Sequence, residues 1–357
     1  MPETFTPAQL KEQNKQHIYQ LIYNRRRISL QDIAYELHLS RPTVTGKLNE
    51  LEAEGLIQKE GLISSELAGR KASAYTIVSD YRVAVGVDLG PNNFSIAIIN
   101  LYGELLDHTT LFLDFEDTET YYQKASELIQ NFVQSLCHSP EQVLGIGFSL
   151  SPGSRKPSLT SFRKHLAYTV TFISDADSGA ISWLWHHPEI SDAVYISLSY
   201  HLSTARIQQG AIFTGIHGHG TRAEHICIDP SGKKCFCGRT GCLETICALS
   251  ELLTPEEELS QFIQQVRGGE ASYKERFQMY LQALSKAIDT LRLVSDIPCV
   301  LGGTMGNHLS EEDLDFLYAE CDKALSAPEA KDYLRIHSPK PHSLAMGAAL
   351  PFIWGFL

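Results

Sequence analysis

The segment from His225 to Glu244 constrains this chain more than any other part of it. It reads HICIDPSGKKCFCGRTGCLE and holds four potential metal ligands: His225, Cys235, Cys237 and Cys242. One imidazole and three thiolates form a complete tetrahedral ligand set for zinc. Gly238 and Gly241 let the backbone fold back and deliver the last cysteine. Because the set leaves no open position for water, we predict a structural Zn2+ rather than a catalytic one. The alternative is a group of ordinary buried thiols or a disulfide.

The same segment resembles the ROK family, which comprises repressors, open reading frames and sugar kinases. The family pattern is Gly-His followed by C-x-C-G-x-x-G-C-L-E, and the matching positions are His225, Cys235, Cys237, Gly238, Gly241, Cys242, Leu243 and Glu244. Glu224 replaces the glycine before the histidine. The resemblance covers residues 82–357. It implies an actin-like ATPase fold of two α/β lobes, with zinc held by those four ligands.

Composition favours a soluble globular protein without a membrane span. The 357 residues are 43% hydrophobic and 20% charged, and no apolar run reaches eighteen residues. The N-terminus is polar, so we expect no signal peptide and a cytoplasmic protein. A zinc-type cysteine cluster also fits a reducing compartment, and we expect the remaining cysteines to be free thiols: Cys137, Cys227, Cys247, Cys299 and Cys321.

Charge is unevenly distributed along the chain, whose net formal charge is -12. Residues 1–77 carry ten Lys and Arg against nine Asp and Glu, a net of +1, which leaves -13 for the remainder. The N-terminal part alone has a charge that tolerates DNA.

The first eighty residues predict a winged helix-turn-helix. Apolar spacing at Ile18, Leu21 and Ile22 predicts one helix, Ser29 is placed to cap a second, and Ser40 to cap a third. A β-hairpin follows. This stretch also resembles the DNA-binding domain of ROK repressors, which places the third helix in the major groove. The alternative is a helical dimerisation domain. We predict domains at residues 1–78 and 79–357.

Candidate DNA contacts follow from that interpretation. We assign base and phosphate contacts to the exposed start of the third helix and to the wing: Arg41, Thr43, Thr45, Lys47, Arg70 and Lys71. Arg70 lies in a Gly-Arg-Lys run that resembles the family's basic wing tip, which would place its side chain in a minor groove.

Both phosphate loops expected of a ROK kinase are altered. Asp88 matches the family position at the end of a buried strand, but Pro91-Asn92-Asn93 replaces the glycines that follow. Residues 199–205, SYHLSTA, replace the second glycine-rich run. Phosphate loops need glycine because a Cβ blocks close approach of the backbone amides. The chain therefore predicts loss of ATP binding and no enzyme activity. Residues 301–304, LGGT, resemble the family's adenosine-side loop, and a simple strand-to-helix turn is the alternative.

The sugar site implied by the resemblance is altered as well. Asp175 matches the family's general base and is a vestigial catalytic position here, while Glu244 and His225 match sugar-binding positions. Arg222 stands where the family has a ligand-binding glutamate, which reverses the charge. A guanidinium suits phosphate or carboxylate. We therefore name Asp175, Arg222, His225 and Glu244 as effector-binding candidates. In the alternative, Arg222 pairs internally with Glu224 or Asp175 and fills a vestigial pocket.

Together these features predict a DNA-binding transcriptional regulator, most simply a repressor of carbohydrate-related genes. We expect it to bind a double-stranded operator as a homodimer or homotetramer and to respond to a sugar or sugar-phosphate effector. The first alternative is a ROK sugar kinase with an appended DNA-binding domain, which the two altered phosphate loops disfavour. A ligand-independent DNA-binding scaffold held together by zinc is a further alternative.

Overall fold

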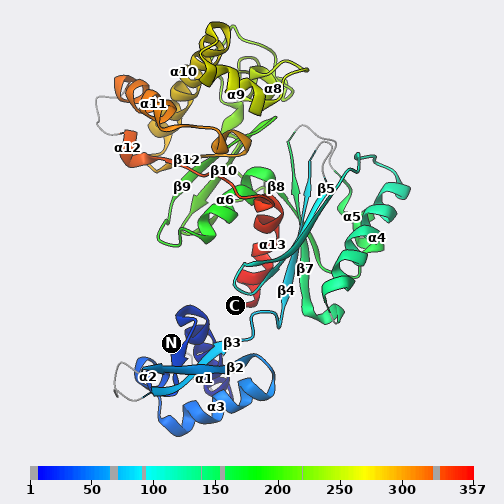
Figure 1. The fold of residues 1–357 in the computed structure, drawn as a ribbon, viewed down its shortest axis with the longest axis vertical. Coiled ribbons are helices and arrows are strands. Elements are labelled where there is room, and N and C mark those ends of the chain that lie inside the picture. The colour runs from blue at the N-terminus through cyan, green and yellow to red at the C-terminus, as the bar shows by residue number, and fades with distance from the viewer. Residues whose placement is uncertain are drawn as a thin grey trace. The chain divides into compact units, whose positions relative to one another are not determined.

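The computed structural model describes residues 7–64, 71–90, 94–137, 139–152, 157–218, 220–324 and 330–357. The chain divides into two compact units (Figure 1). One comprises residues 1–83 with the short segments 100–104 and 355–357, and the other comprises residues 84–99 and 105–354. Each unit is described by itself. None of the helices in the described ranges is long and apolar enough to cross a membrane.

The first unit is a winged helix-turn-helix, as the sequence predicts. Its elements are α1 (Pro7–Arg25), β1 (Ile28–Ser29), α2 (Leu30–Glu36), α3 (Arg41–Ala53), β2 (Ile57–Ser64) and β3 (Lys71–Ile77). The strands form an antiparallel sheet in the order β1-β3-β2.

Local sequence signals explain where these helices begin and end. The Ser29 hydroxyl accepts from the backbone N–H of Asp32, and the Ser40 hydroxyl accepts from that of Thr43, so both predicted N-caps are confirmed. Gly55 follows α3 with φ +73°, a conformation that favours glycine. The buried face of α3 consists of Val44, Leu48 and Leu51, which leaves the opposite face in solvent.

The second unit begins with a lobe built on one five-stranded sheet. Its elements are β4 (Val83–Leu89), β5 (Phe94–Asn100), β6 (Leu105–Leu111), α4 (Glu119–Leu136), η1 (Pro140–Gln142), β7 (Val143–Leu150), α5 (Leu159–His165) and β8 (Val170–Ser174). The strand order is β6-β5-β4-β7-β8.

A second lobe follows in the chain. Its elements are α6 (Asp175–Trp185), β9 (Ala193–Leu198), β10 (Leu202–Gln208), β11 (Ala211–Ile212), η2 (Ala223–His225), α7 (Glu244–Cys247), α8 (Leu249–Leu252), α9 (Leu259–Gly268), α10 (Ala271–Val294), β12 (Cys299–Gly302), η3 (Thr304–Asn307), α11 (Glu311–Ala324), α12 (Ala330–Tyr333) and β13 (Leu334–Ile336). The last helix, α13 (Ser343–Phe356), returns to the first lobe.

The two lobes repeat one topology. The second sheet runs β11-β10-β9-β12-β13, so in each lobe the first strand is central, with the next two on one side and the last two on the other. β9 pairs antiparallel with β10 and parallel with β12. This repetition puts the turn after the first strand of each lobe at an equivalent place.

Helix α13 packs closely against the first sheet. A Cβ added at Gly86 or Gly147 would lie 1.7 or 1.8 Å from the carbonyl oxygen of Ala345 or Ala348. The next residue, Phe148, points to the opposite face, where its ring centroid lies 4.5 Å from that of Phe162 on α5. The small residues at the start of this helix therefore allow close packing.

The second sheet also has an apolar layer on each face. On one face Tyr195, Ala205 and Ile207 pack against Ala176 and Ala180 of α6. On the other face alternate residues of the same strands pack against α9 and α10: Ile196, Leu198 and Leu202. Because side chains alternate between the two faces of the sheet, this packing fixes how the side chains at the start of β10 are oriented.

Candidate metal centre and cleft residues

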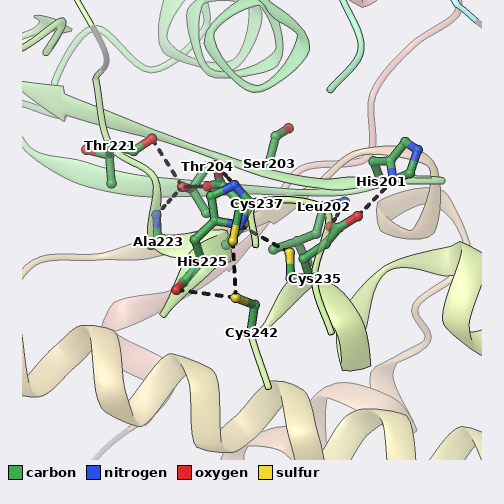
Figure 2. Close-up of polar contacts among 12 residues, drawn as sticks. His201, Leu202, Ser203, Thr204, Thr221, Ala223, His225, Cys235, Cys237 and Cys242 are labelled. Atoms are coloured by element: carbon green, nitrogen blue, oxygen red, sulfur yellow. Dashed lines mark hydrogen bonds and ion pairs between the residues drawn. The ribbon is translucent and has the colours of Figure 1, made fainter. Parts of the chain in front are cut away.

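A short loop brings the four predicted metal ligands together (Figure 2). His225 ends η2, and the chain returns through isolated antiparallel bridges between Cys227 and Cys242 and between Lys234 and Thr240. Gly241 has φ +69°, and a Cβ there would lie 1.5 Å from the carbonyl oxygen of Asp229. Glycine is therefore required at this position for both conformational and steric reasons.

The ligand atoms have the spacing of a metal site. One ligand atom from each of the four residues lies within 4.8 Å of all the others. Cys237 Sγ is 3.6 Å from Cys242 Sγ, and Cys235 Sγ is 3.6 Å from His225 Nδ1. Zinc–sulfur bonds of about 2.3 Å in a tetrahedron give sulfur–sulfur edges of about 3.8 Å. A disulfide would require about 2.05 Å. All eight cysteines are free thiols, as predicted for five of them, so the cluster can hold a metal ion.

The two nitrogens of His225 face different surroundings. Nδ1 faces the cysteine sulfurs, whereas Nε2 lies 3.9 Å from Oε1 of Glu224. A metal on Nδ1 would therefore leave Nε2 available toward Glu224.

Three buried carboxylates bond to three consecutive residues of β10, and we call them the β10 carboxylates: Asp175, Glu224 and Glu244. The backbone N–H of Leu202 donates to Glu244 Oε2 over 2.6 Å. The Ser203 hydroxyl donates to Asp175 Oδ1 over 2.6 Å, and the Thr204 hydroxyl donates to Glu224 Oε2 over 2.5 Å. Thr204 in turn accepts from the backbone N–H of Ala223 (Figure 2). The segment that replaces the second phosphate loop thus supplies partners for buried acids.

Asp175 has a strongly raised pKa. It begins α6, is 2% exposed, and accepts from the N–H of Ala176 as well as from Ser203. Burial raises the pKa of its carboxyl to about 7, the two hydrogen bonds oppose the rise, and Asp88 adds to it. Burial also raises the pKa of Asp88 to about 6. Asp88 Oδ1 is buried and has no hydrogen-bond partner among the described residues.

Glu224 and Arg222 differ in burial although they lie two residues apart. Glu224 is 8% exposed, and burial raises its pKa, opposed by the Thr204 hydroxyl and by the charge of Arg222. Arg222 is exposed. Burial is the main cause that lowers the pKa of His225, and the charge of Arg222 lowers it further. Sequence reasoning treated Glu224 as a departure from the family pattern and as a possible internal partner of Arg222. A charged residue in place of glycine was the signal that it occupies the site.

The second altered phosphate loop forms the turn between β9 and β10. The Ser199 hydroxyl accepts from the backbone N–H of Thr304 over 3.2 Å. A Cβ on Gly303 would lie 2.7 Å from that hydroxyl oxygen. His201 Nδ1 lies 2.8 Å from Glu244 Oε1. The backbone N–H of Thr304, in the LGGT turn, therefore already has a hydrogen-bond acceptor within the protein. The first altered loop, residues 91–93, lies outside the described residues.

A cavity of about 360 Å³ lies beside this turn. Its lining includes Asp88, Ser199, Gly303, Thr304, Lys340 and His342. The LGGT segment itself is a strand followed by the 3₁₀ turn η3.

The predicted DNA contacts have different surroundings. Arg41, Thr43 and Thr45 are exposed on α3, and Lys71 is exposed at the start of β3, whereas Arg70 lies outside the described residues. Lys47 was expected to be exposed and is not. Its side chain is 13% exposed, and its Nζ lies 2.6 Å from Oε2 of Glu50, one turn along α3.

Sequence reasoning missed the centre of the outward face of α3. Pro42, Gly46 and Asn49 recur at i, i+4 and i+7 and are all exposed, opposite the buried face. A Cβ on Gly46 would meet no atom within 4 Å. Glycine inside an exposed helix costs about 1 kcal/mol relative to alanine. Its presence here is typical of a site where a ligand approaches the backbone closely.

Comparison with known families identifies the chain. The ROK family matches residues 84–352, so this chain belongs to the ROK family. The MarR family matches residues 12–61. Both the predicted family and the predicted winged helix-turn-helix are therefore confirmed.

Relatives and solved structures agree with this assignment. The chain is 25% identical over 270 residues to the xylose repressor of Caldicellulosiruptor bescii, covering 70% of this chain and 67% of that protein. It is 25% identical over 258 residues to the transcriptional dual regulator NagC of Escherichia coli, covering 67% of this chain and 63% of that protein. The chain thus spans about two thirds of the length of these curated relatives.

The fold is shared with both regulators and kinases. A crystal structure of a ROK family transcriptional regulator, a homologue of the Escherichia coli MLC protein, has a TM-score of 0.74 at 20% identity and covers 97% of this chain and 96% of its own. A ROK hexokinase from Thermus thermophilus has a TM-score of 0.62 at 19% identity, and the match covers 75% of this chain and 97% of the hexokinase. The predicted actin-like two-lobed fold is confirmed.

Burial of Asp175 predicts a specific pH dependence of stability. An aspartate has a pKa of about 3.9 in an unfolded chain. Between that value and about 7 the folded state binds more protons than the unfolded state, so this group lowers stability as pH rises. Asp175→Asn keeps an acceptor for Ser203 and removes the titration. We expect the variant to gain stability over the parent, on the order of 2–4 kcal/mol, between pH 5 and pH 8. Thermal unfolding of both proteins across that range checks this, and a pH-independent difference contradicts it.

Proposed function

We propose that this protein is a DNA-binding transcriptional regulator, a cytoplasmic repressor of carbohydrate-related genes. Residues 1–78 read the operator, and residues 79–357 form a kinase-derived body. The observation that carries this proposal is α3, whose outward face is exposed and lacks acidic residues in its first turn. The names of the relatives, xylose repressor and transcriptional dual regulator, support it.

The protein would act as a homodimer or homotetramer. Operator half-sites lie about one helical turn apart, so two helix-turn-helix units on a symmetric assembly read them together. An effector in the body then changes the spacing of the two units by favouring one arrangement of the assembly.

The body has lost ATP binding in this proposal and is not an enzyme. Ser199 accepts the Thr304 amide, and bulky Tyr200 and His201 stand where a phosphate loop needs glycine. A sugar kinase with an appended DNA-binding domain is the alternative, supported by the shared fold of the ROK kinases.

The metal of the cysteine cluster is a structural Zn2+. His225, Cys235, Cys237 and Cys242 complete a closed tetrahedral set of soft and borderline ligands, and zinc suits such a set. The metal would hold a loop that has little secondary structure and few apolar side chains.

The effector is an anionic sugar or sugar phosphate. The β10 carboxylates already accept hydrogen bonds from the protein, so they offer less to a neutral sugar than free carboxylates would. Arg222 adds an exposed guanidinium beside them, which suits phosphate or carboxylate. Asp175, Glu244 and Nε2 of His225 complete the expected site.

Zinc content tests the metal assignment. Freshly purified protein is expected to hold one zinc per chain by elemental analysis, because four ligands converge on one position. Cys235→Ser should lose the metal and lower the unfolding temperature, since structural zinc contributes directly to folding. Cys137→Ser, which changes a thiol outside the cluster, should keep it. Zinc-free protein with three reactive thiols in the cluster would refute the assignment.

Variants of α3 test DNA recognition. Arg41→Ala should cost ~1–3 kcal/mol at one operator position if the side chain contacts a base. Gly46→Ala should raise stability by about 1 kcal/mol and still weaken operator binding, because the added methyl blocks close approach. Lys124→Ala, an exposed change in α4, is the control. Fluorescence anisotropy with operator DNA measures each. Unchanged binding by both α3 variants would show that another surface reads the operator.

Calorimetry tests the effector and the loss of ATP binding together. We expect no heat from ATP, weak or no binding of neutral hexoses, and binding of a hexose phosphate or sugar acid that Arg222→Glu abolishes through charge repulsion. Tight binding of a neutral hexose unaffected by Arg222→Glu would refute the anionic effector. Phosphorylation of a hexose that disappears in Asp175→Asn would favour the kinase alternative.

A further inference from the structure

Cys227 lies directly across the chain from one of the proposed zinc ligands. It forms an antiparallel bridge with Cys242, flanked by hydrogen bonds from Leu243 N to Ile226 O (2.9 Å) and from Ile228 N to Gly241 O (2.8 Å). These two bonds make Cys227 and Cys242 a non-hydrogen-bonded pair. In such pairs the Cα atoms are about 4.5 Å apart and the side chains share one face.

That backbone geometry permits a disulfide. Disulfides span Cα separations of about 4.4–6.8 Å. Cys227 is exposed, whereas Cys242 is fully buried, and the two are free thiols here. Because the two side chains share one face, rotation about χ1 of the exposed Cys227 can bring its sulfur toward Cys242.

We propose that Cys227 and Cys242 form an oxidation-sensitive pair, in which a cross-strand disulfide removes one ligand from the zinc site and releases the metal. The proposal rests on the zinc assignment above. Loss of Cys242 leaves His225, Cys235 and Cys237, and the last of these is exposed to solvent. Three ligands with one accessible edge hold zinc less tightly than a closed set of four.

The chemistry needs a two-electron oxidant, for which a peroxide is sufficient. The exposed Cys227 sulfur attacks hydrogen peroxide, an S–O bond forms as the O–O bond breaks, and hydroxide leaves. The Cys242 sulfur then attacks the sulfenic sulfur, the S–S bond forms as the S–O bond breaks, and a second hydroxide leaves. The two cysteines lose two electrons, two protons complete two waters, and zinc departs as Zn2+ without a change in oxidation state.

The consequence of the oxidation would reach Glu244 through the chain itself. Glu244, two residues after Cys242, begins α7 and accepts from the N–H of Leu202. Oxidation therefore acts on the segment that holds one of the β10 carboxylates in place.

Peptide mapping of the full-length protein can identify the pair without ambiguity. Trypsin cuts after Arg222, Lys234 and Arg239, which separates Cys227, the Cys235–Cys237 pair and Cys242 onto three peptides. Cys247 shares the last peptide and is distinguished from Cys242 by fragmentation. Zinc is measured first by elemental analysis, so that a failed zinc assignment is recognised before peroxide is added.

We expect a small excess of hydrogen peroxide to release one zinc per chain, detected with a chelating dye, and to link the Cys227 and Cys242 peptides. A dithiol reductant with added zinc should reverse both changes. Cys227→Ser should hold zinc before treatment, lose it severalfold more slowly, and yield no such linked peptide. Cys137→Ser should behave like the parent. Zinc release at the parental rate from Cys227→Ser, retention of zinc by the treated parent, or linkage of Cys237 to Cys242 instead, would overturn the proposal.

Discussion

The site depends on one constraint: a carboxylate removed from water must be given donors. Asp175, Glu224 and Glu244 are each less than a tenth exposed, and each receives a hydrogen bond from a successive residue of β10. An uncompensated buried charge costs several kcal/mol. A shift of β10 along its neighbours would expose these three carboxylates or remove their hydrogen-bond donors. The register of β10 against β9, with Leu202 opposite Leu198, is thus coupled to the position of α6, η2 and α7.

The same constraint explains how a kinase fold can persist after its phosphate loops change. A glycine-rich turn exposes backbone amides for a ligand, and without that ligand the amides need other acceptors. Here the Ser199 hydroxyl accepts from the backbone N–H of Thr304, and Nδ1 of His201 lies at hydrogen-bond distance from Oε1 of Glu244. Replacing glycine by residues with polar side chains therefore stabilises the turn in a protein that we propose binds no nucleotide. The two-lobed architecture, shared with the ROK kinases, is unaffected because it depends on apolar packing around each sheet.

Much of the fold and the metal centre was predictable because the signals are local. Ser29 and Ser40 cap helices through bonds to residues three positions away, and the four metal ligands lie within eighteen residues. Contacts between distant segments were not predictable. Sequence alone did not indicate that Ser203 would meet Asp175, because their pairing depends on the packing of β10 on α6. The low exposure of Lys47 was missed for a different reason: its partner Glu50 is one turn away, and the pattern of exposure was weighed without that neighbour.

The cysteine-rich loop, residues 226–243, joins the local and the long-range parts of the structure. It contains no helix and only isolated bridges, and backbone hydrogen bonds such as Ile228 N to Gly241 O and Cys235 N to Arg239 O hold its shape. The loop connects His225, next to Glu224, with Glu244 at the start of α7. Gly241, which accommodates the Asp229 carbonyl, allows the chain to fold so that the four ligand atoms converge. Under the metal assignment proposed above, coordination would act together with these hydrogen bonds to place Glu224 and Glu244, and a chemical change at one ligand would reach both carboxylates.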